Sequence, residues 1–281
     1  MDTNVVQPVI SIILPTRDGA ARISAAIRSV VAQTYPSWEL IIIDDGSVDE
    51  TEAVVQNFCR LHPEIIFHKN AVNLGIQKTL NKGIAFARGA YIARIDDDDT
   101  WTDQDKLAQQ LEYMAQHPTC ALVGTYAIVV DEEQHEVMRY TLPQSDESIR
   151  KAILRKNCFV HSSVLARKSF VQKVGGYSEL PEARHIEDYD LWLRLGAVGS
   201  LANIARYSVT LTMRKGSISG KNKLQQFKKI IKLIARYQHT YPGYTAAYVR
   251  SIVRLVIYGF LIAMPIKVIS GNMIKWYKRL W

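Results

Sequence analysis

The sequence contains little cysteine, no acidic residue in its last 91 positions and no long uncharged segment in that basic part. Its three cysteines lie far apart without a CxxC pair, which argues against a disulfide framework or a zinc site and favours a reducing compartment. The uncharged stretch Leu255–Ile266 has only twelve residues, whereas a transmembrane helix needs roughly 18 or more. Residues 1–8 lack the basic and apolar regions of a signal peptide, so we expect a cytoplasmic protein.

Several common nucleotide-binding and calcium-binding signatures are absent as well. The chain has no GxxxxGK[ST] loop and no GxGxxG after its first apolar run, which argues against a P-loop ATPase and a dinucleotide-binding domain. The aspartate spacings do not fit an EF-hand loop. The segment Thr16–Gly19 is also a poor match to the glycine-rich basic loop that a nucleotidyltransferase would carry.

The charges are distributed very unevenly along a chain of otherwise ordinary globular composition, with 48% hydrophobic and 22% charged residues. All 27 acidic residues lie at or before Asp190, where 19 lysines and arginines accompany them, a net charge of −8. The last 91 residues carry 16 lysines and arginines and a net charge of +16. Such a basic part indicates a polyanionic partner, either nucleic acid or an anionic lipid surface.

Strands and helices are expected to alternate through the first hundred residues. Apolar, β-rich runs predict strands at 9–14, 38–43, 65–68 and 91–95. Between them, helical patterns lie at 22–33 and 78–87, and a third helix is predicted from a cap at Ser47 or Asp49 to residue 62. This order predicts a parallel, doubly wound sheet, which binds ligands outside the carboxyl ends of its strands. Three polar clusters fall at such ends, namely Thr16–Asp18, Asp44–Asp45 and Asp96–Asp99. Further along we expect a helix near 107–114, a strand at 121–130, a helix from Asp146 and a strand at 159–165.

The run Asp96–Asp99 is the most informative of the three clusters. Four adjacent carboxylates repel one another, and a hard divalent cation such as Mg²⁺ or Mn²⁺ relieves that repulsion because it prefers oxygen ligands. A metal held by one or two carboxylates keeps its other positions for waters and substrate phosphates. The alternative interpretation is an acidic turn that is simply solvated.

In their order and spacing, the motifs of residues 8–215 closely resemble those of family-2 glycosyltransferases of the GT-A fold. The matching segments are Ser11–Thr16, Ala32–Pro36, Glu39–Ser47, Asn73–Gly75, Ala93–Asp99, Gly175–Tyr177 and Glu187–Arg194. The resemblance implies a Rossmann-like, mostly parallel sheet flanked by helices. It places a catalytic domain at 1–218, with a nucleotide-sugar half at about 8–100 and an acceptor half at about 101–218. Residues 219–281 would form a basic, amphipathic helical extension.

The resemblance also implies an activity, which is transfer of a sugar from a nucleotide-diphosphate donor, a UDP-sugar first of all, to an acceptor hydroxyl with inversion. One sugar per encounter is expected, because the QxxRW motif of processive synthases is absent. Asp98 corresponds to the ligand of Mn²⁺ or Mg²⁺, and Asp99 would support it. The residues implied for donor binding are Pro15, Thr16, Asp18, Asp45, Asn73, Gly75, Lys78, Asp96, Asp97 and Arg214. For Asp44 and Asp45 the alternative is helix capping, and for Lys78 it is a solvent-facing helix position.

Inversion needs a base beside the attacking hydroxyl, and by the resemblance Asp188, next to Glu187, supplies it. The alternative is a helix N-terminus with acidic residues in its first turn. His161 and Arg184 lie near the family's acceptor site, although a lone histidine is more often structural, and Trp192 is expected in the core. The segment Met213–Ser217 lacks the histidine that many relatives carry, which leaves Arg214 or Lys215 to neutralise phosphate.

The composition of the C-terminal end suits an interfacial helix, with cations toward lipid phosphates and aromatic residues at headgroup depth. Those residues are Lys267, Lys275, Trp276, Tyr277, Lys278, Arg279 and Trp281. The alternative is a helical subdomain that packs on the catalytic core. The expected partners are the donor, a saccharide or lipid-linked saccharide acceptor and an anionic membrane surface, without nucleic acid. This predicts a peripheral protein on the inner face of the cell membrane that acts in cell-surface polysaccharide synthesis. A nucleotidyltransferase and a non-catalytic polyanion-binding protein are the alternative functions.

Overall fold

The computed structural model describes residues 8–213 and 223–263. The predictions for Arg214, Lys215, the domain boundary near 219 and the interfacial residues 267–281 therefore lie outside the described part of the chain. The strands are β1 (Ile10–Thr16), β2 (Trp38–Asp44), β3 (Ile65–Lys69), β4 (Tyr91–Arg94), β5 (Thr100–Trp101), β6 (Cys120–Val130), β7 (Glu136–Tyr140), β8 (Leu165–Arg167) and β9 (Ser200–Thr212). The helices are α1 (Ile23–Val31), α2 (Thr51–Leu61), α3 (Ile76–Phe86), α4 (Lys106–Gln116), α5 (Asp146–Ile153), α6 (Lys168–Lys173), α7 (Glu187–Gly196), α9 (Lys223–Ala235) and α10 (Tyr244–Ala263), with short 3₁₀ turns η1 (His161–Ser163) and η2 (Pro181–Ala183).

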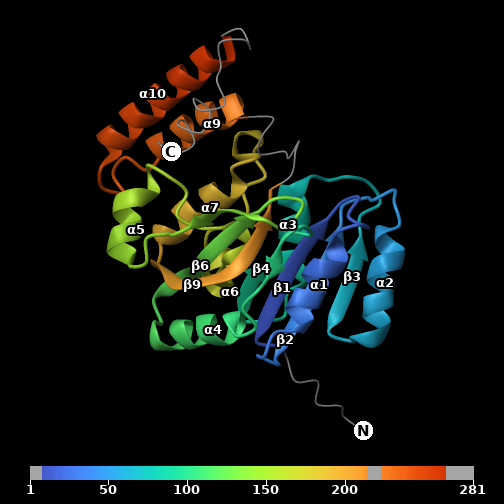
Figure 1. Cartoon of the computed structure of the whole chain (residues 1–281). Coiled ribbons are helices and arrows are strands. Elements are labelled where there is room, and N and C mark those ends of the chain that lie inside the picture. The colour runs from blue at the N-terminus through green and yellow to red at the C-terminus, as the bar shows by residue number, and fades with distance from the viewer. Residues whose placement is uncertain (1–7, 214–222, 264–281) are drawn as a thin grey trace.

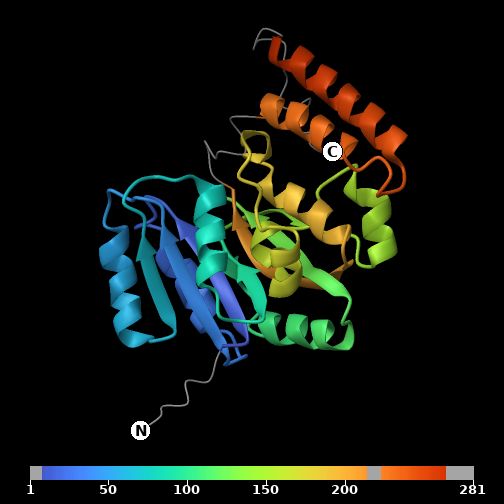
Figure 2. The ribbon, with the colours of Figure 1, turned by 180° about the vertical axis from the view of Figure 1, so that it is seen from behind.

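The N-terminal half is a parallel sheet in the order β3-β2-β1-β4 with helices on both faces (Figures 1 and 2). The central strands β1 and β2 are buried along their whole length and mostly apolar, because both faces are covered. Ile13 and Ile41 pack with Leu80 of α3 on one face. Ile12 packs with Ile27 of α1 on the other. The parallel register pairs Thr16 with Asp44 and so aligns the ends of β1 and β2 at one edge.

The second half of the sheet is mixed. β8 runs antiparallel between β4 and β6, while β6 and the long β9 lie parallel to each other. β7 forms an antiparallel hairpin with β6. No strand was predicted at Ser200–Thr212, where β9 completes this half of the sheet.

One strand prediction is wrong. Residues 159–165 were expected to be extended, but they contain the turn η1, and β8 begins only at Leu165. The Ser163 backbone N–H and hydroxyl both donate to the carbonyl oxygen of Val160, at 2.9 and 2.8 Å. Local hydrogen bonds of this kind compete with a strand ladder, and an apolar count does not reveal them.

The helix α9 lies beside α7, and α10 packs on the outer side of α9 (Figure 1). Leu233, Ile234 and Ala247 belong to the same buried cluster as Leu193 of α7, and the Tyr241 hydroxyl donates to the Leu193 carbonyl oxygen at 2.7 Å. For residues 223–263 this matches the alternative interpretation, a helical subdomain on the core. None of the helices in the described ranges is long and apolar enough to cross a membrane.

Candidate active site

The ends of β1, β2 and β4 bring the three polar clusters to one edge of the sheet, as their positions in the sequence predicted. Thr16, at the end of β1, donates its hydroxyl to Asp97 at 2.7 Å. Asp18 has a positive φ of 48° and accepts a hydrogen bond from the Val48 backbone N–H, which follows β2, at 3.0 Å. The loops after the first, second and fourth strands are therefore joined by direct contacts.

Each aspartate of the Asp96–Asp99 run has its own surroundings. Arg94, which is almost fully buried, donates to Asp96 through both terminal amino groups. Asp99 is buried and accepts from the Ser162 hydroxyl, and burial, together with the charges of Asp96 and Asp98, raises its pKa well above the ordinary value. Since all four side chains are at least partly buried, the alternative of a solvated acidic turn is wrong.

Arg22 is a site residue that the sequence interpretation missed. Its Nη2 atom lies 2.9 Å from Asp97 Oδ2, and its Nη1 donates to the Asp18 carbonyl oxygen at 2.9 Å. The guanidinium thus neutralises one of the four carboxylates and ties the loop after β1 to the end of β4. A run of four acids signals that a nearby cation is needed, but no local pattern shows which arginine supplies it.

Asp45 holds the loop that precedes α3. Its carboxylate accepts hydrogen bonds from Asn70 Nδ2 at 2.9 Å, from the Leu74 backbone N–H at 2.8 Å and from the Gly75 backbone N–H at 2.9 Å. Gly75 has a φ of +87°, a conformation that glycine adopts at little cost. Asn73 and Lys78 are exposed beside this loop. The implied role of Asp45 in donor binding stays a prediction.

The capping alternative for Asp44 and Asp45 does not match the contacts. Asp44 accepts from the Ser47 backbone N–H at 2.8 Å and from the Ser47 hydroxyl at 2.5 Å, within its own turn. Asp49 accepts from the Thr51 backbone N–H at 3.0 Å just before α2, but the N-cap of α2 is Glu50 without a side-chain cap, so the predicted cap at Ser47 or Asp49 is wrong. Asp45, directly after a buried strand, therefore binds the loop before α3 and does not cap a helix.

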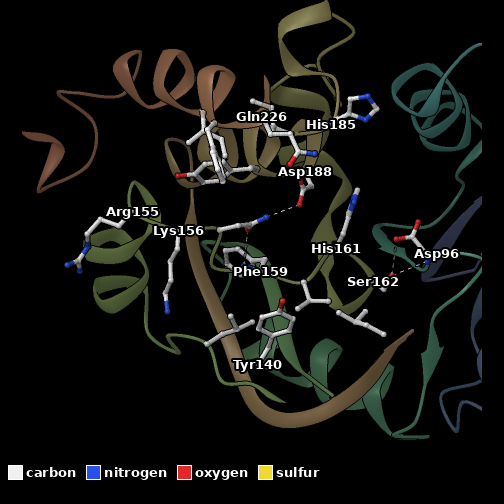
Figure 3. Close-up of a pocket in the computed structure, with 18 of the residues that line it drawn as sticks. Asp96, Tyr140, Arg155, Lys156, Phe159, His161, Ser162, His185, Asp188 and Gln226 are labelled. Carbon is white, nitrogen blue, oxygen red and sulfur yellow. Dashed lines mark hydrogen bonds between the residues drawn. The ribbon is translucent and has the colours of Figure 1, made fainter. Parts of the chain in front are cut away.

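A cavity of about 650 Å³ connects the Asp96–Asp99 run with the start of α7 (Figure 3). Asp96 and Asp98 line one end, and Asp188 and His161 line the middle. Asp188 accepts a hydrogen bond from Asn157 Nδ2 at 2.8 Å, and burial raises the pKa of its carboxyl above the ordinary value. A partly buried carboxylate that faces a cavity and has a raised pKa is suited to accept a proton.

Glu187 differs from its neighbour. Burial and the charge of Asp188 raise the pKa of Glu187 to about 7, and its Oε2 atom is buried without a hydrogen-bond partner among the described residues. Both carboxyls lie in the first turn of α7. The helix-terminus interpretation is confirmed, and of the two residues only Asp188 is among those that line the cavity.

The other acceptor-side predictions have different outcomes. His161 lines the cavity and lies 2.7 Å from the Tyr177 hydroxyl, and burial, with the charge of Arg94, lowers its pKa well below 6.5, so the ring is neutral. Trp192 is 1% exposed and meets His161 edge-on, which confirms its place in the core. Arg184 is exposed and its carbonyl oxygen accepts from Lys229 of α9, whereas His185, which was not predicted, lines the cavity.

Residues 11–175 match the family model described as "Glycosyl transferase family 2". This chain belongs to glycosyltransferase family 2. Among its relatives, the amylovoran biosynthesis glycosyltransferase AmsE of Erwinia amylovora is 29% identical over 92% of this chain and 94% of that protein. The UDP-Glc:alpha-D-GlcNAc-diphosphoundecaprenol beta-1,3-glucosyltransferase WfgD of Escherichia coli is 30% identical over 66% of this chain and 71% of its own length.

Solved structures of other proteins share the fold of this chain. The S. aureus TarS fragment 1–349 in complex with UDP-GlcNAc superimposes with a TM-score of 0.72, at 14% identity over 92% of this chain and 76% of that one. The mannosyltransferase PcManGT from Pyrobaculum calidifontis, in complex with GDP-Man and Mn²⁺, gives 0.65 at 15% identity over 98% and 84%. The predicted GT-A fold is confirmed, and this family-2 glycosyltransferase is an enzyme.

Proposed function

We propose that this enzyme transfers one sugar per encounter, with inversion, from a nucleotide-diphosphate donor to a hydroxyl of a saccharide acceptor. The observation that carries the proposal is the single cavity that holds Asp96 and Asp98 at one end and the Asp188 carboxylate in its middle. A transferase that inverts needs a donor end and a base facing each other across the transferred sugar. The cavity supplies both kinds of group on opposite sides of His161 (Figure 3).

In this proposal Asp188 is the base. Asn157 Nδ2 donates to Asp188 Oδ2, which orients the carboxylate and leaves its other oxygen for the acceptor hydroxyl. As the hydroxyl oxygen forms a bond to the anomeric carbon of the donor sugar, its proton passes to Asp188. The bond from that carbon to the diphosphate oxygen breaks, and the nucleoside diphosphate leaves with the electron pair. The raised pKa of Asp188 favours proton acceptance.

The donor end fits a hard divalent cation. Arg94 holds Asp96 and Arg22 holds Asp97, while Asp98 lines the cavity. In the described ranges no group of three or more histidine, cysteine or acidic side chains forms a metal cage, so Mn²⁺ or Mg²⁺ would take its other ligands from water and donor phosphates. When bound through Asp98, the cation would neutralise the charge that develops on the leaving diphosphate. The proposed donor contacts are Pro15, Thr16, Asp18, Asp45, Asn73, Gly75, Lys78, Asp96, Asp97 and Arg214.

The relatives support a finer proposal for the donor and the acceptor. WfgD is named for a UDP-sugar donor and a diphosphoundecaprenol acceptor, and AmsE for the biosynthesis of amylovoran. We therefore propose a UDP-sugar donor and a lipid-linked saccharide acceptor in cell-surface polysaccharide synthesis. The net charge of +16 in the last 91 residues fits peripheral binding at the anionic inner face of the cell membrane.

Two variants test the proposal. Asp188→Asn keeps the shape of the side chain but cannot accept the proton, so transfer falls by about 10²- to 10⁴-fold while UDP and Mn²⁺ still bind. Asp98→Ala loses the Mn²⁺-dependent hydrolysis of UDP-sugars. The exposed Asp105→Asn, at the start of α4 and outside the cavity lining, is the matched control and keeps wild-type rates.

The products are identified by mass spectrometry in a screen of nucleotide sugars with lipid-linked acceptors. Release of a nucleoside diphosphate together with a glycosylated acceptor supports the proposal. An Asp188→Asn enzyme that turns over at nearly the wild-type rate contradicts the assignment of the base. Release of pyrophosphate would instead identify a nucleotidyltransferase.

A further inference from the structure

The end of the cavity opposite Asp96 is basic. Arg155, Lys156, Arg250 and Arg254, which we call the basic cluster, line that end. Figure 3 shows Arg155 and Lys156 on the far side of the cavity from Asp96, with His161 and Asp188 between them. A smaller adjoining hollow of about 250 Å³ is lined by Arg155, Lys156 and Arg250 together with Ala152. The cavity thus runs from an acidic donor end to a basic end.

The members of the basic cluster repel one another. Burial lowers the pKa of Arg250, and the positive charges of Arg155 and Arg254 lower it further. In the described part of the chain, neither Arg155 nor Lys156, which follow the end of α5, forms an ion pair with a carboxylate, although Arg150 and Lys151 within α5 do. An anion placed beside Arg155 and Lys156 would stabilise these two cations and relieve the repulsion within the basic cluster.

The basic cluster lies next in the chain to a residue that contacts Asp188, the proposed catalytic base. Lys156 precedes Asn157, whose side chain donates to Asp188, and consecutive Cα atoms lie about 3.8 Å apart. An acceptor whose hydroxyl lies at Asp188 therefore has its neighbouring groups within reach of Arg155 and Lys156. In the proposed function the donor diphosphate binds at the opposite end of the cavity. The anion that the basic cluster binds therefore belongs to a second phosphate-bearing molecule.

The helix α10 adds an apolar face beside the basic cluster. Val249, Val253, Val256 and Phe260 repeat at helical spacing on one face and are 56, 43, 64 and 63% exposed. Arg250 and Arg254 follow two of these residues and line the cavity on the adjacent face. The helix contains no acidic residue. An exposed apolar face flanked by arginines is typical of a helix that lies at a membrane interface.

We propose that the basic cluster binds the diphosphate of a lipid-linked acceptor and that the apolar face of α10 contacts the hydrocarbon carrier chain of that acceptor. This inference rests on the proposed function, because it places the acceptor hydroxyl at Asp188. A soluble phosphate alone does not account for the apolar face. The combination of a diphosphate and a hydrocarbon chain accounts for both surfaces.

Binding of farnesyl diphosphate to the full chain, measured by calorimetry, tests the proposal. Wild-type protein is expected to bind farnesyl diphosphate more tightly than both inorganic pyrophosphate and farnesyl monophosphate. The double variant Arg155→Gln/Lys156→Gln is expected to lose about tenfold or more in affinity for farnesyl diphosphate, since a hydrogen bond to a charged group contributes at least that factor. The control Arg60→Gln/Lys173→Gln removes the same charge from exposed positions on α2 and α6 and leaves the affinity unchanged.

Equal affinities of the wild type and the first double variant overturn the proposal, as does an equal loss in the control. A second arm uses phosphatidylcholine vesicles with and without phosphatidylglycerol. If the basic cluster variant loses binding to phosphatidylglycerol vesicles but not to farnesyl diphosphate, the basic cluster is a headgroup site and the proposal is wrong. Val256→Ser/Phe260→Ser is expected to weaken binding of farnesyl diphosphate but not of inorganic pyrophosphate.

The proposed function fails in a different way. Its own readout is hydrolysis of UDP-sugars by the wild-type protein, which does not involve farnesyl diphosphate. Wild-type protein that hydrolyses UDP-sugars but does not prefer farnesyl diphosphate over the monophosphate and pyrophosphate contradicts the diphosphate site alone. Wild-type protein that shows the preference but neither hydrolyses nor transfers a sugar contradicts the proposed function alone.

Discussion

Replacing Glu187 with glutamine is expected to stabilise the protein at neutral and alkaline pH. The Glu187 side chain lies in the first turn of α7, and its Oε2 atom is buried without a hydrogen-bond partner among the described residues. Burial and the charge of Asp188 raise the pKa of Glu187 from the ordinary 4.5 to about 7. The folded protein therefore binds this proton more tightly than the unfolded chain does.

The free energy of unfolding depends on pH because the pKa of Glu187 differs between the folded and the unfolded state. Below pH 4.5 the carboxyl is protonated in both states and contributes nothing to the pH dependence. Between pH 4.5 and about 7 the unfolded chain releases the proton first, so the free energy of unfolding falls as the pH rises. Above pH 7 the loss is complete and amounts to at most about 3 kcal/mol. Glutamine has nearly the same shape and no charge, so the variant does not undergo this loss.

Urea unfolding at a series of pH values from about 5 to about 8 measures the effect. The difference in unfolding free energy between Glu187→Gln and wild type is expected to increase with pH toward about 3 kcal/mol. Glu147→Gln is the control, because Glu147 is exposed on α5 and its hydrogen bond with Lys151 lowers its pKa. A difference that stays constant with pH, or an equal rise in the control, would refute the account of Glu187.

Two further variants test the donor side. Arg22→Met removes the cation beside Asp97, and we expect calorimetry to show that UDP-sugar binds about tenfold more weakly. The reason is that an ionic hydrogen bond contributes roughly 1.5–3 kcal/mol. Unchanged affinity for the UDP-sugar argues against a role of Arg22 in donor binding. Asp45→Asn places an amide N–H against a backbone N–H of the loop at Leu74 and Gly75, which should cost about 1–3 kcal/mol. Calorimetric melting is expected to show a transition lower by several degrees, and an unchanged melting temperature contradicts the importance of this contact.

The apolar runs and the polar residues that follow them were enough to predict the first half of the fold. β1, β2 and β4 are almost entirely buried, so most of their residues are apolar and the strands are recognisable locally. The carboxyl ends of parallel strands meet at one edge, which is why Thr16, Asp45 and Asp96–Asp99 could be assigned to one site. The motif Glu187–Arg194 likewise indicated the acidic start of α7.

The partners of these residues depend on tertiary structure. Ser162, in a segment expected to be a strand, forms hydrogen bonds with the Asp96–Asp99 run instead. Arg22 meets Asp97 from 75 positions earlier in the chain. No periodicity links residues so far apart, because their contact results from the packing of β1 against β4 and of the intervening loops.

The sequence by itself determined the fold family, the donor end with Asp98 as its proposed metal ligand and the choice of Asp188 as the proposed base. These features depend on short segments whose residue types and order carry the information. Only the tertiary structure decided that Asp96, Asp98 and Asp188 line one cavity, and that Arg155 and Lys156 meet Arg250 at its other end. The physical reason is that α10 packs on α9 and its Ala247 joins the apolar cluster that also contains Leu193 of α7, and this packing brings Arg250 to the same cavity as Arg155 and Lys156.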